Sequence, residues 1–322
     1  MGFLRHLFSG KEESAEEREQ KEKENNFDVL KYDGIHALQI GRFSYAIACF
    51  THALDLQEDQ ETREYLALAY IRNDDLEMAV EEFSKLIALH PDNKNYAVNK
   101  ANLLYELEEY ESSRVLCQEL LDQDSELVMP LYLLARLDMA EGHLEEAEDH
   151  VSDALSKRED FYDGSLLRAE IRYKRDDYEG ALSDLDNLIE NGNVSDEVLL
   201  QKGMVLASMG KSEEAILYYN NVLSQNPFIV EAYGNLAMIH IKAGEYDKAS
   251  EVISDGLEQN GESSLLISIR AELKDAQGNS EGAESDRKLA EEYKIAEEER
   301  KEEDYDVERE MQERMKAVNP LI

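Results

Sequence analysis

The sequence predicts an all-α protein in which antiparallel helix pairs stack one on another, an α-solenoid. Three observations predict this fold: a composition that favours helices, a small residue that recurs at a constant interval, and a second small residue at a constant distance before it. Only four Pro and 16 Gly interrupt the 322 residues, and Ala, Leu, Glu and Lys are abundant, which is typical of helical proteins. Stretches that favour strands are absent.

The recurring small residue marks a repeat of 33 residues once and of 34 residues six times. Two small residues per period predict two helices in close contact, because Gly and Ala let helix backbones approach where larger side chains would hold them apart. The first small residue occurs at Ala46, Ala79, Ser113, Ala147, Ala181, Ala215, Ala249 and Ala283. The second lies twelve residues earlier, at Gly34, Ala67, Ala101, Ala135, Ala169, Gly203, Ala237 and Ala271.

Turn residues fall where the two helices of each pair should meet. Gly is favoured there because it adopts most easily the left-handed backbone that ends a helix. Pro91 and Pro227 fall at the end of a repeat, where a proline stops one helix and prepares the next. The turn positions are Gly41, Asp74, Glu108, Gly142, Asp176, Gly210, Gly244 and Gly278.

The repeat from Asp196 to Ile229 resembles one known family. It contains, in register, Gly203, Leu206, Gly210, Ala215, Tyr219, Val222 and Pro227. This pattern resembles the tetratricopeptide repeat, a 34-residue unit with small residues at its eighth and twentieth positions, an aromatic near the twenty-fourth and Pro at the thirty-second. The resemblance covers about eight repeats, from Phe27 to about Glu297, and implies a right-handed superhelix of helix-turn-helix units.

The chain also departs from the family pattern. No Trp occupies the fourth position, Ser113 replaces the inner Ala, and Arg287 stands where a bulky apolar residue is usual. The arginine predicts that the second helix of the eighth repeat faces water and caps the solenoid. We expect an N-terminal apolar peptide with a mobile charged lead over 1–26, the solenoid over 27–284, and a charged capping helix over 285–322.

The resemblance implies a binding surface as well. In this family the first helix of each pair lines the concave groove, and the second, fifth, sixth, ninth, twelfth and thirteenth positions face inward. Amide side chains there can hold an extended peptide backbone because an amide both donates and accepts, and Tyr and Met suit adaptable contact with apolar or aromatic segments. The candidate partner-binding residues are Asn99, Asn102, Tyr105, Met129, Tyr132, Arg136, Met139, Tyr173, Gln201 and Asn235.

Other interpretations of these residues stay open. Tyr and Met at helical spacing also fit a core, and Asn99 and Asn102 also fit a solvated helix face. Another binding mode of the family, in which basic residues grip a C-terminal carboxylate, is not expected. Lys31 is followed by Ile35 and Tyr65, so the basic side of that clamp is missing.

The charge of the chain excludes some partners. With 34 Lys and Arg against 73 Asp and Glu, the net charge is −39, and no basic run is long enough to follow phosphates. Nucleic acid is not expected, and a basic protein or peptide with apolar or aromatic anchors is favoured. Two cysteines, Cys49 and Cys117, are too few for a disulfide framework, and no apolar run could span a membrane. These features, with no export signal, predict a cytoplasmic protein.

No catalytic motif occurs, and His143 and His150 among scattered acids do not specify a metal site. We therefore predict no enzyme, no metal and no cofactor, but a scaffold for protein–protein interaction that binds a peptide segment of a partner in its concave groove. The alternative is a self-assembling structural protein, joined through terminal repeats or through a C-terminal helix whose apolar stripe is Met311, Met315 and Val318.

The apolar N-terminus leaves its role open. Phe3, Leu4, Leu7 and Phe8 would gather on one face of a short helix. Docking on a partner, weak contact with a membrane surface and packing on the first repeat all fit this pattern.

Overall fold

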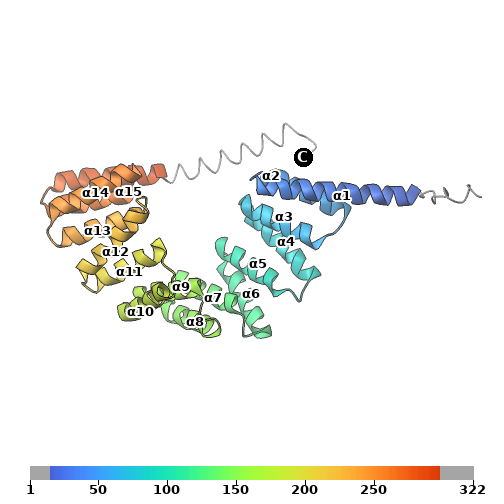
Figure 1. Cartoon of the computed structure of the whole chain (residues 1–322), viewed down its shortest axis with the longest axis horizontal. Coiled ribbons are helices and arrows are strands. Elements are labelled where there is room, and N and C mark those ends of the chain that lie inside the picture. Colours follow the sequence, from blue (N-terminus) through green and yellow to red (C-terminus); the bar gives the residue numbers. More distant parts are fainter. Residues whose placement is uncertain (1–14, 298–322) are drawn as a thin grey trace, which may run out of the picture. The chain divides into compact units, whose positions relative to one another are not determined.

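A computed structural model describes residues 15–297, and within them every regular element is a helix (Figure 1). The helices follow one another in antiparallel pairs, as the repeat predicted. The pairs are α1 (Ala15–Gln39) with α2 (Phe43–Leu56), α3 (Gln60–Arg72) with α4 (Leu76–Leu89), α5 (Lys94–Glu106) with α6 (Tyr110–Gln123), α7 (Val128–Ala140) with α8 (Leu144–Lys157), α9 (Tyr162–Lys174) with α10 (Tyr178–Glu190), α11 (Asp196–Ser208) with α12 (Ser212–Gln225), α13 (Val230–Lys242) with α14 (Tyr246–Asn260), and α15 (Ser264–Ala276) with a helix over 280–297. No helix in this part of the chain has the length and apolar character that a membrane crossing needs.

The chain forms two compact units that divide within α7, between Leu133 and Leu134. The N-terminal unit holds α1 to α6 and the first half of α7, and is blue to green in Figure 1. The C-terminal unit holds the second half of α7 and all later helices, and is green to red. In each unit, successive helix pairs lie side by side, so each pair covers the apolar face of the next.

The small residues of the repeat lie where the helices of a pair meet. All eight first small residues, from Ala46 to Ala283, are 0% exposed. The alanines at the second small position are 0–1% exposed, and Gly34 and Gly203 are buried as well. Ser113, the one hydroxyl in the first set, donates to the carbonyl of Ala101 at 2.7 Å, so its polar group is satisfied. The all-α helix-pair fold predicted from these positions is confirmed.

Glycine replaces alanine where a large ring crosses the small position. A Cβ on Gly203 would lie 2.5 Å from the ring of Tyr219, and one on Gly34 would lie 2.5 Å from the ring of Phe50. Both rings are buried, at 1% and 0% exposure. In these two pairs the ring occupies the space that an alanine Cβ would need. Ring size alone does not decide the residue, because Ala67 holds the small position in the repeat of Phe83, which is 7% exposed.

The turns within the helix pairs share one geometry. All eight predicted turn residues have left-handed backbone, with φ between 58° and 82°, including Asp74, Glu108 and Asp176. In every turn the next N–H donates to the carbonyl five residues earlier, as in Glu109 to Leu104, at 2.8–2.9 Å. This bond satisfies a carbonyl that the end of the helix leaves open, which explains why the same geometry returns in each repeat.

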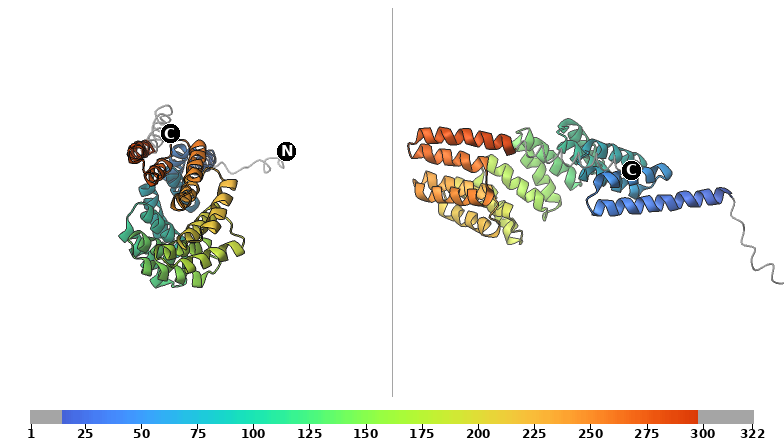
Figure 2. Two further views of the ribbon diagram at one scale, coloured as in Figure 1. Left: turned by 90° about the vertical axis from the view of Figure 1, so that its left-hand side faces the viewer. Right: turned by 90° about the horizontal axis from the view of Figure 1, so that it is seen from above.

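The last helix completes the eighth pair. Figure 2 shows the helix over 280–297 alongside α15, at the red end of the chain. Ser264 donates to the carboxylate of Glu297 from its backbone N at 2.9 Å and from its hydroxyl at 2.8 Å, which caps the start of α15. Arg287 is exposed and pairs with Asp275, in agreement with a helix that turns one face to water.

Two of the expected segment boundaries fall inside helices. The expected boundary between residues 26 and 27 lies inside α1, which begins at Ala15. The expected boundary between residues 284 and 285 lies inside the last helix. Glu and Lys favour a helix nearly as well as Ala and Leu, so a change to charged residues does not end one. Residues 1–14 and 298–322 lie outside the described part, and with them the apolar N-terminal peptide and the stripe of Met311, Met315 and Val318.

Ion pairs are buried inside some of the helix pairs. Asp286 is 3% exposed and lies 2.8 Å from Arg270 and 2.6 Å from Lys274. Three repeats earlier, Asp184 accepts from Arg168 in the same way. Burial alone would raise the pKa of Asp286, but hydrogen bonds from Arg270 and Lys274 outweigh it and hold that pKa below its ordinary value.

Candidate functional site

The predicted partner-binding residues lie on the first helices of their pairs and divide between the two units. Those of the N-terminal unit lie on α5 and the first half of α7, and those of the C-terminal unit lie on the second half of α7 and on α9, α11 and α13. Asn99 is exposed and the other nine are half-buried. None of the ten is fully buried, although Tyr173 packs against a core cluster of the C-terminal unit. The first group is Asn99, Asn102, Tyr105, Met129 and Tyr132; the second is Arg136, Met139, Tyr173, Gln201 and Asn235.

In the N-terminal unit the candidate amides and an aromatic share α5. Asn99, Asn102 and Tyr105 follow one another at helical spacing. The ring of Tyr105 lies 5.5 Å from that of Tyr110, which begins α6, so the second helix supports the tyrosine of the first. A pocket beside α5 is lined by Lys100 and Leu104 and not by these three residues, so it does not join the candidates of this unit.

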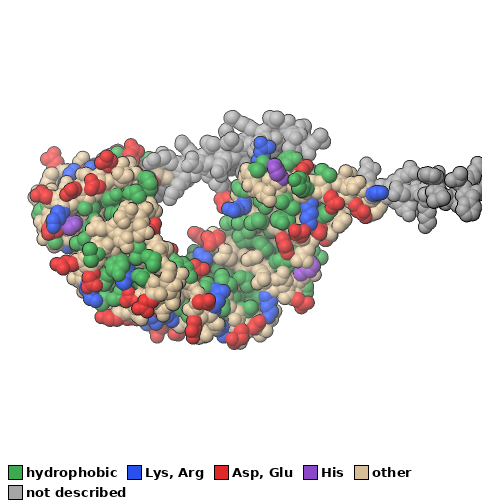
Figure 3. All heavy atoms as spheres, in the orientation of Figure 1, with side chains coloured by type: hydrophobic (Ala, Val, Ile, Leu, Met, Phe, Trp, Pro, Cys, Tyr) green, Lys and Arg blue, Asp and Glu red, His purple; other side chains and the backbone are tan. Residues whose placement is uncertain are grey.

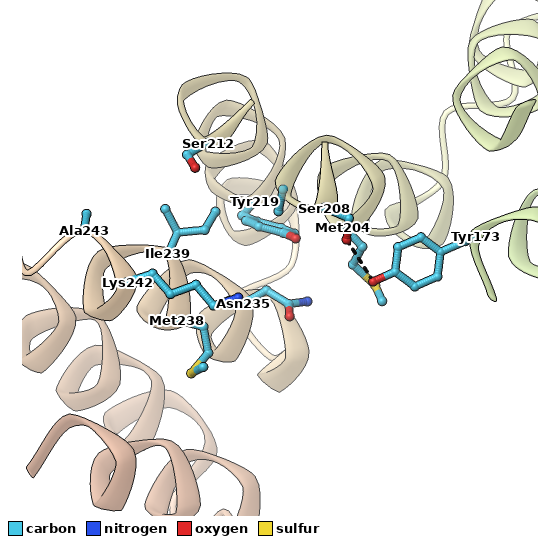
Figure 4. A pocket seen from close by; sticks show the side chains of 11 residues that line it. Tyr173, Met204, Ser208, Ser212, Tyr219, Asn235, Met238, Ile239, Lys242 and Ala243 are labelled. Atoms are coloured by element: carbon cyan, nitrogen blue, oxygen red, sulfur yellow. Dashed lines mark hydrogen bonds between the residues drawn. The ribbon is translucent and has the colours of Figure 1, made fainter. Parts of the chain in front are cut away.

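In the C-terminal unit three helix pairs build a pocket of about 320 Å³. Tyr173 comes from α9, the next residues from α11 and α12, and the last from α13 and the residue that follows it, so the pocket crosses neighbouring repeats (Figure 4). It brings together two of the predicted residues, Tyr173 and Asn235, and it leaves Arg136, Met139 and Gln201 outside. Its lining is Tyr173, Met204, Ala207, Ser208, Ser212, Tyr219, Asn235, Met238, Ile239, Lys242 and Ala243.

Hydroxyl groups form one side of the pocket. The hydroxyls of Tyr173 and Ser208 lie 3.2 Å apart and bind one another across two repeats. Tyr219 is 1% exposed, yet Figure 4 shows its hydroxyl directed toward the side chains of Met204 and Asn235 rather than into the core. Within residues 15–297 this hydroxyl has no hydrogen-bond partner. No fully enclosed side-chain oxygen or nitrogen of this part of the chain lacks a partner, so the hydroxyl oxygen borders open space. Burial raises the pKa of Tyr219, so the group keeps its proton and can donate.

Asn235 and Lys242 complete the polar groups, and both come from α13. Asn235 is half-buried, and its amide has no side-chain hydrogen bond within the described chain. Lys242 is exposed and forms no ion pair with any described residue. By contrast, Lys202 on α11 is paired with Asp186. In Figure 4 the side chain of Lys242 extends along the pocket toward Asn235.

The lining contains no acidic residue among the described side chains that form it. This is unusual for a chain with 73 Asp and Glu, whose acidic side chains are spread over the visible faces of both units (Figure 3). Met204, Met238 and Ile239 provide the apolar part of the wall. The pocket thus offers hydrogen-bond donors and one positive charge beside an apolar surface.

Sequence reasoning missed Tyr219 and Lys242 as site residues. Tyr219 occupies the aromatic position of the repeat, which normally belongs to the core, and its ring is indeed buried. Lys242 occupies the thirteenth position of its repeat, one of the inward positions, so the spacing could have found it.

A second polar cluster lies at the end of α7. Atoms of Asp138, Glu141 and His143 that could bind a metal lie within 4.8 Å of one another. Asp138 is buried and already binds Nδ1 of His150 at 2.6 Å, and Glu141 lies 3.5 Å from Nδ1 of His143. These carboxylates have partners within the protein, so the cluster has a structural explanation without an ion.

Comparison with known proteins agrees with this geometry. Two family models, both described as tetratricopeptide repeat, match residues 34–93, 65–127 and 132–195 in one case and 206–273 in the other, which together exceed half of the chain. A curated relative, Intraflagellar transport protein 70B of Mus musculus, is 31% identical in an alignment of 153 residues that covers 44% of this chain and 22% of that protein. The chain therefore spans about a fifth of that relative's length.

Solved structures of low sequence identity have the same fold. A tetratricopeptide repeat protein from Parabacteroides merdae aligns with a TM-score of 0.62 and 19% identity, over 73% of this chain and 93% of that one. YrrB, described as a TPR protein with an unusual peptide-binding site, aligns with a TM-score of 0.50 and 23% identity, over 60% of this chain and 99% of that one. From its repeats, its helix pairs and these matches, the chain belongs to the tetratricopeptide repeat family.

Proposed function

We propose that this protein is a protein-interaction scaffold that holds an extended segment of a partner against the inner helices of its repeats. The fold supports interaction in general, because stacked helix pairs present long surfaces and the family typically lacks catalytic activity. The finer proposal, a peptide held by its backbone, depends on one group of side chains.

The observation that carries the proposal is a row of amides. Gln201 on α11 and Asn235 on α13 occupy the sixth position of successive repeats, 34 residues apart, and both are half-buried. Within the described residues neither side chain has a hydrogen-bond partner. Asn99 holds the same position in the N-terminal unit. Half-buried amides without protein partners are available to a ligand, and a peptide backbone offers them both a donor and an acceptor.

The surroundings of these amides favour a peptide over a small molecule. The pocket beside Asn235 is open to solvent along α13 and is walled by Met204 and Met238, whose flexible side chains adapt to different contacts. YrrB, a protein of the same fold, is described as having a peptide-binding site, which is in line with the proposal.

The charge of the chain favours a basic partner. With a net charge of −39, the protein attracts positively charged segments and repels acidic ones over about a Debye length. We propose that the partner segment is basic overall, with apolar or aromatic anchors, and that charge mainly speeds its capture.

The test uses a random peptide library displayed on phage and selected against the full-length chain. Affinities of the selected peptides are then measured by calorimetry for the wild type and for Gln201→Ala/Asn235→Ala. Each lost hydrogen bond should remove about 0.5–1.5 kcal/mol, so the double variant should bind about 5- to 150-fold more weakly.

The matched control is Asn220→Ala, which removes an exposed amide from the second helix α12 and should leave binding unchanged. Wild-type affinity in the Gln201→Ala/Asn235→Ala variant would contradict the proposal. Self-assembly through the C-terminal helix stays a prediction, because its apolar stripe lies outside the described residues. The cytoplasmic location also stays a prediction.

A further inference from the structure

We infer that the pocket between α9, α11, α12 and α13 receives one carboxylate side chain, an aspartate or a glutamate, from the bound peptide. The inference rests on the proposed function, because the amides of the inner face would hold the peptide whose side chain enters the pocket. It goes further by naming the chemistry of that side chain.

The hydrogen-bonding groups that lack partners favour an acceptor. Tyr219 is 1% exposed and aims its hydroxyl into the pocket without a partner among residues 15–297. Because no fully enclosed side-chain oxygen or nitrogen of the described chain lacks a partner, this hydroxyl borders the open space of the pocket and can bind a ligand there. Burial of the ring raises the pKa of Tyr219, so the hydroxyl keeps its proton and can donate. The amide of Asn235 has two N–H donors beside its acceptor oxygen, so one N–H remains for a side chain when the rest of the amide binds the backbone, and the ammonium of Lys242 adds three donors. A ligand atom in this pocket therefore meets mostly donors.

The charge of the pocket favours a single negative charge. Lys242 is its one cation, and no acidic residue lines it among the described side chains. A carboxylate carries one negative charge and would leave the pocket neutral. A phosphate group carries about −1.5 to −2 at neutral pH and is usually bound by several basic groups, so it would leave the pocket negative.

The walls favour a side chain over a chain terminus. Met204, Met238 and Ile239 can cover the methylene groups between a backbone and its carboxylate. The amides of Gln201 and Asn235 lie on successive repeats and only Asn235 lines the pocket, so we place the backbone on both amides and a side chain in the pocket. The bound peptide then has basic residues on both sides, which face the acidic surface of the protein. Its one acidic side chain binds the hydrogen-bond donors of the pocket.

The experiment measures a double-mutant cycle between protein and peptide. Peptides selected from the displayed library should share an Asp or Glu at one position. Replacing that acid by Asn or Gln in a synthetic peptide with an amidated C-terminus should weaken binding to the full-length wild type about tenfold or more, as expected for a charge-assisted hydrogen bond. The same replacement should change binding to Lys242→Met less than twofold.

Further variants keep the inference falsifiable if one variant is poorly folded. Lys242→Arg should restore the preference for the acid, and Tyr219→Phe, which keeps the buried ring, should reduce the preference several-fold. Lys211→Met is the matched control, because Lys211 is also exposed and unpaired within the described chain but does not line the pocket. It should keep the full tenfold difference.

The outcomes separate this inference from the proposed function. If peptides bind and depend on Gln201 and Asn235, but the acid and its amide bind equally well, the pocket inference is wrong and the scaffold proposal stands. A preference for phosphorylated over carboxylate peptides, or for free C-termini over internal acids, would also overturn it. If no peptide is selected at all, both proposals fail.

Discussion

Substitution of Gly203 by Ala tests the close contact on which the helix pairs depend. Gly203 lies within α11, where its backbone is helical, so alanine brings no backbone strain. Its new Cβ would nevertheless lie 2.5 Å from Cε1, 2.9 Å from Cδ1 and 3.0 Å from Cζ of Tyr219. Carbon atoms in contact normally stay about 3.5–4.0 Å apart, so the ring or the helix has to move.

The structure sets the size of the effect. Tyr219 is 1% exposed and is packed among Leu206, Leu236 and Ile239, so its ring has little room to move away. An extra methyl group in a filled core costs about 1–3 kcal/mol, whereas replacing Gly by Ala inside a helix gains up to about 1 kcal/mol. We expect Gly203→Ala to lower the free energy of unfolding by about 1–2 kcal/mol.

The assay is urea denaturation followed by far-UV circular dichroism. A second substitution makes the test specific, because Ala169 and Leu185 occupy the same two positions of the fifth repeat and pack without a clash. Tyr219→Leu should therefore reduce the cost of Gly203→Ala, with a favourable interaction energy of about 0.5–3 kcal/mol in the double variant. A Gly203→Ala variant as stable as the wild type, or strictly additive effects, would refute the reasoning.

Three further predictions concern turns, pH and salt. Glu108 and Gly142 both have left-handed backbone, with φ of 58° and 82°, which Gly adopts more easily than other residues. Glu108→Gly should therefore raise the free energy of unfolding by about 0.5–1 kcal/mol, and Gly142→Ala should lower it by about 1 kcal/mol or more. Urea denaturation measures both. The lowered pKa of Asp286 means that its contacts with Arg270 and Lys274 stabilise the fold above the unfolded pKa of about 3.9 and are lost as the pH falls further. The stability difference between wild type and Asp286→Asn should therefore shrink below about pH 4; a difference independent of pH would contradict the ion pairs. Association with a basic peptide should slow several-fold between low and physiological salt in stopped-flow measurements, and an unchanged rate would exclude steering by the acidic surface.

Much of the fold follows from the sequence because the same local constraints on residue size and backbone conformation recur in each repeat. A residue such as Ala181 or Ala215 must be small wherever two helices cross, and both are 0% exposed. The left-handed turn recurs at Gly210 and even at Asp176, because ending one helix and starting the next within a few residues allows few other backbone paths. These constraints act over short distances along the chain, so one sequence is enough to find them.

Which residues share the candidate pocket could be read only from the tertiary structure. Spacing placed Tyr173, Gln201 and Asn235 on inward faces, and they are half-buried there, but spacing could not say which of them share a pocket. The hydroxyl of Tyr219 reaches that pocket because Gly203 leaves room for the ring and the neighbouring repeat leaves space beyond it, which depends on side-chain sizes in several helices at once.

The sequence by itself therefore determined the repeat, the helix pairs and their turns, since a periodic core repeats the same local contacts. Only the tertiary structure decided where the donors collect, because that depends on how neighbouring repeats pack against each other and not on any position within one repeat. At the expected boundaries 26/27 and 284/285 the composition changes but the helices continue, because Glu and Lys also favour a helix.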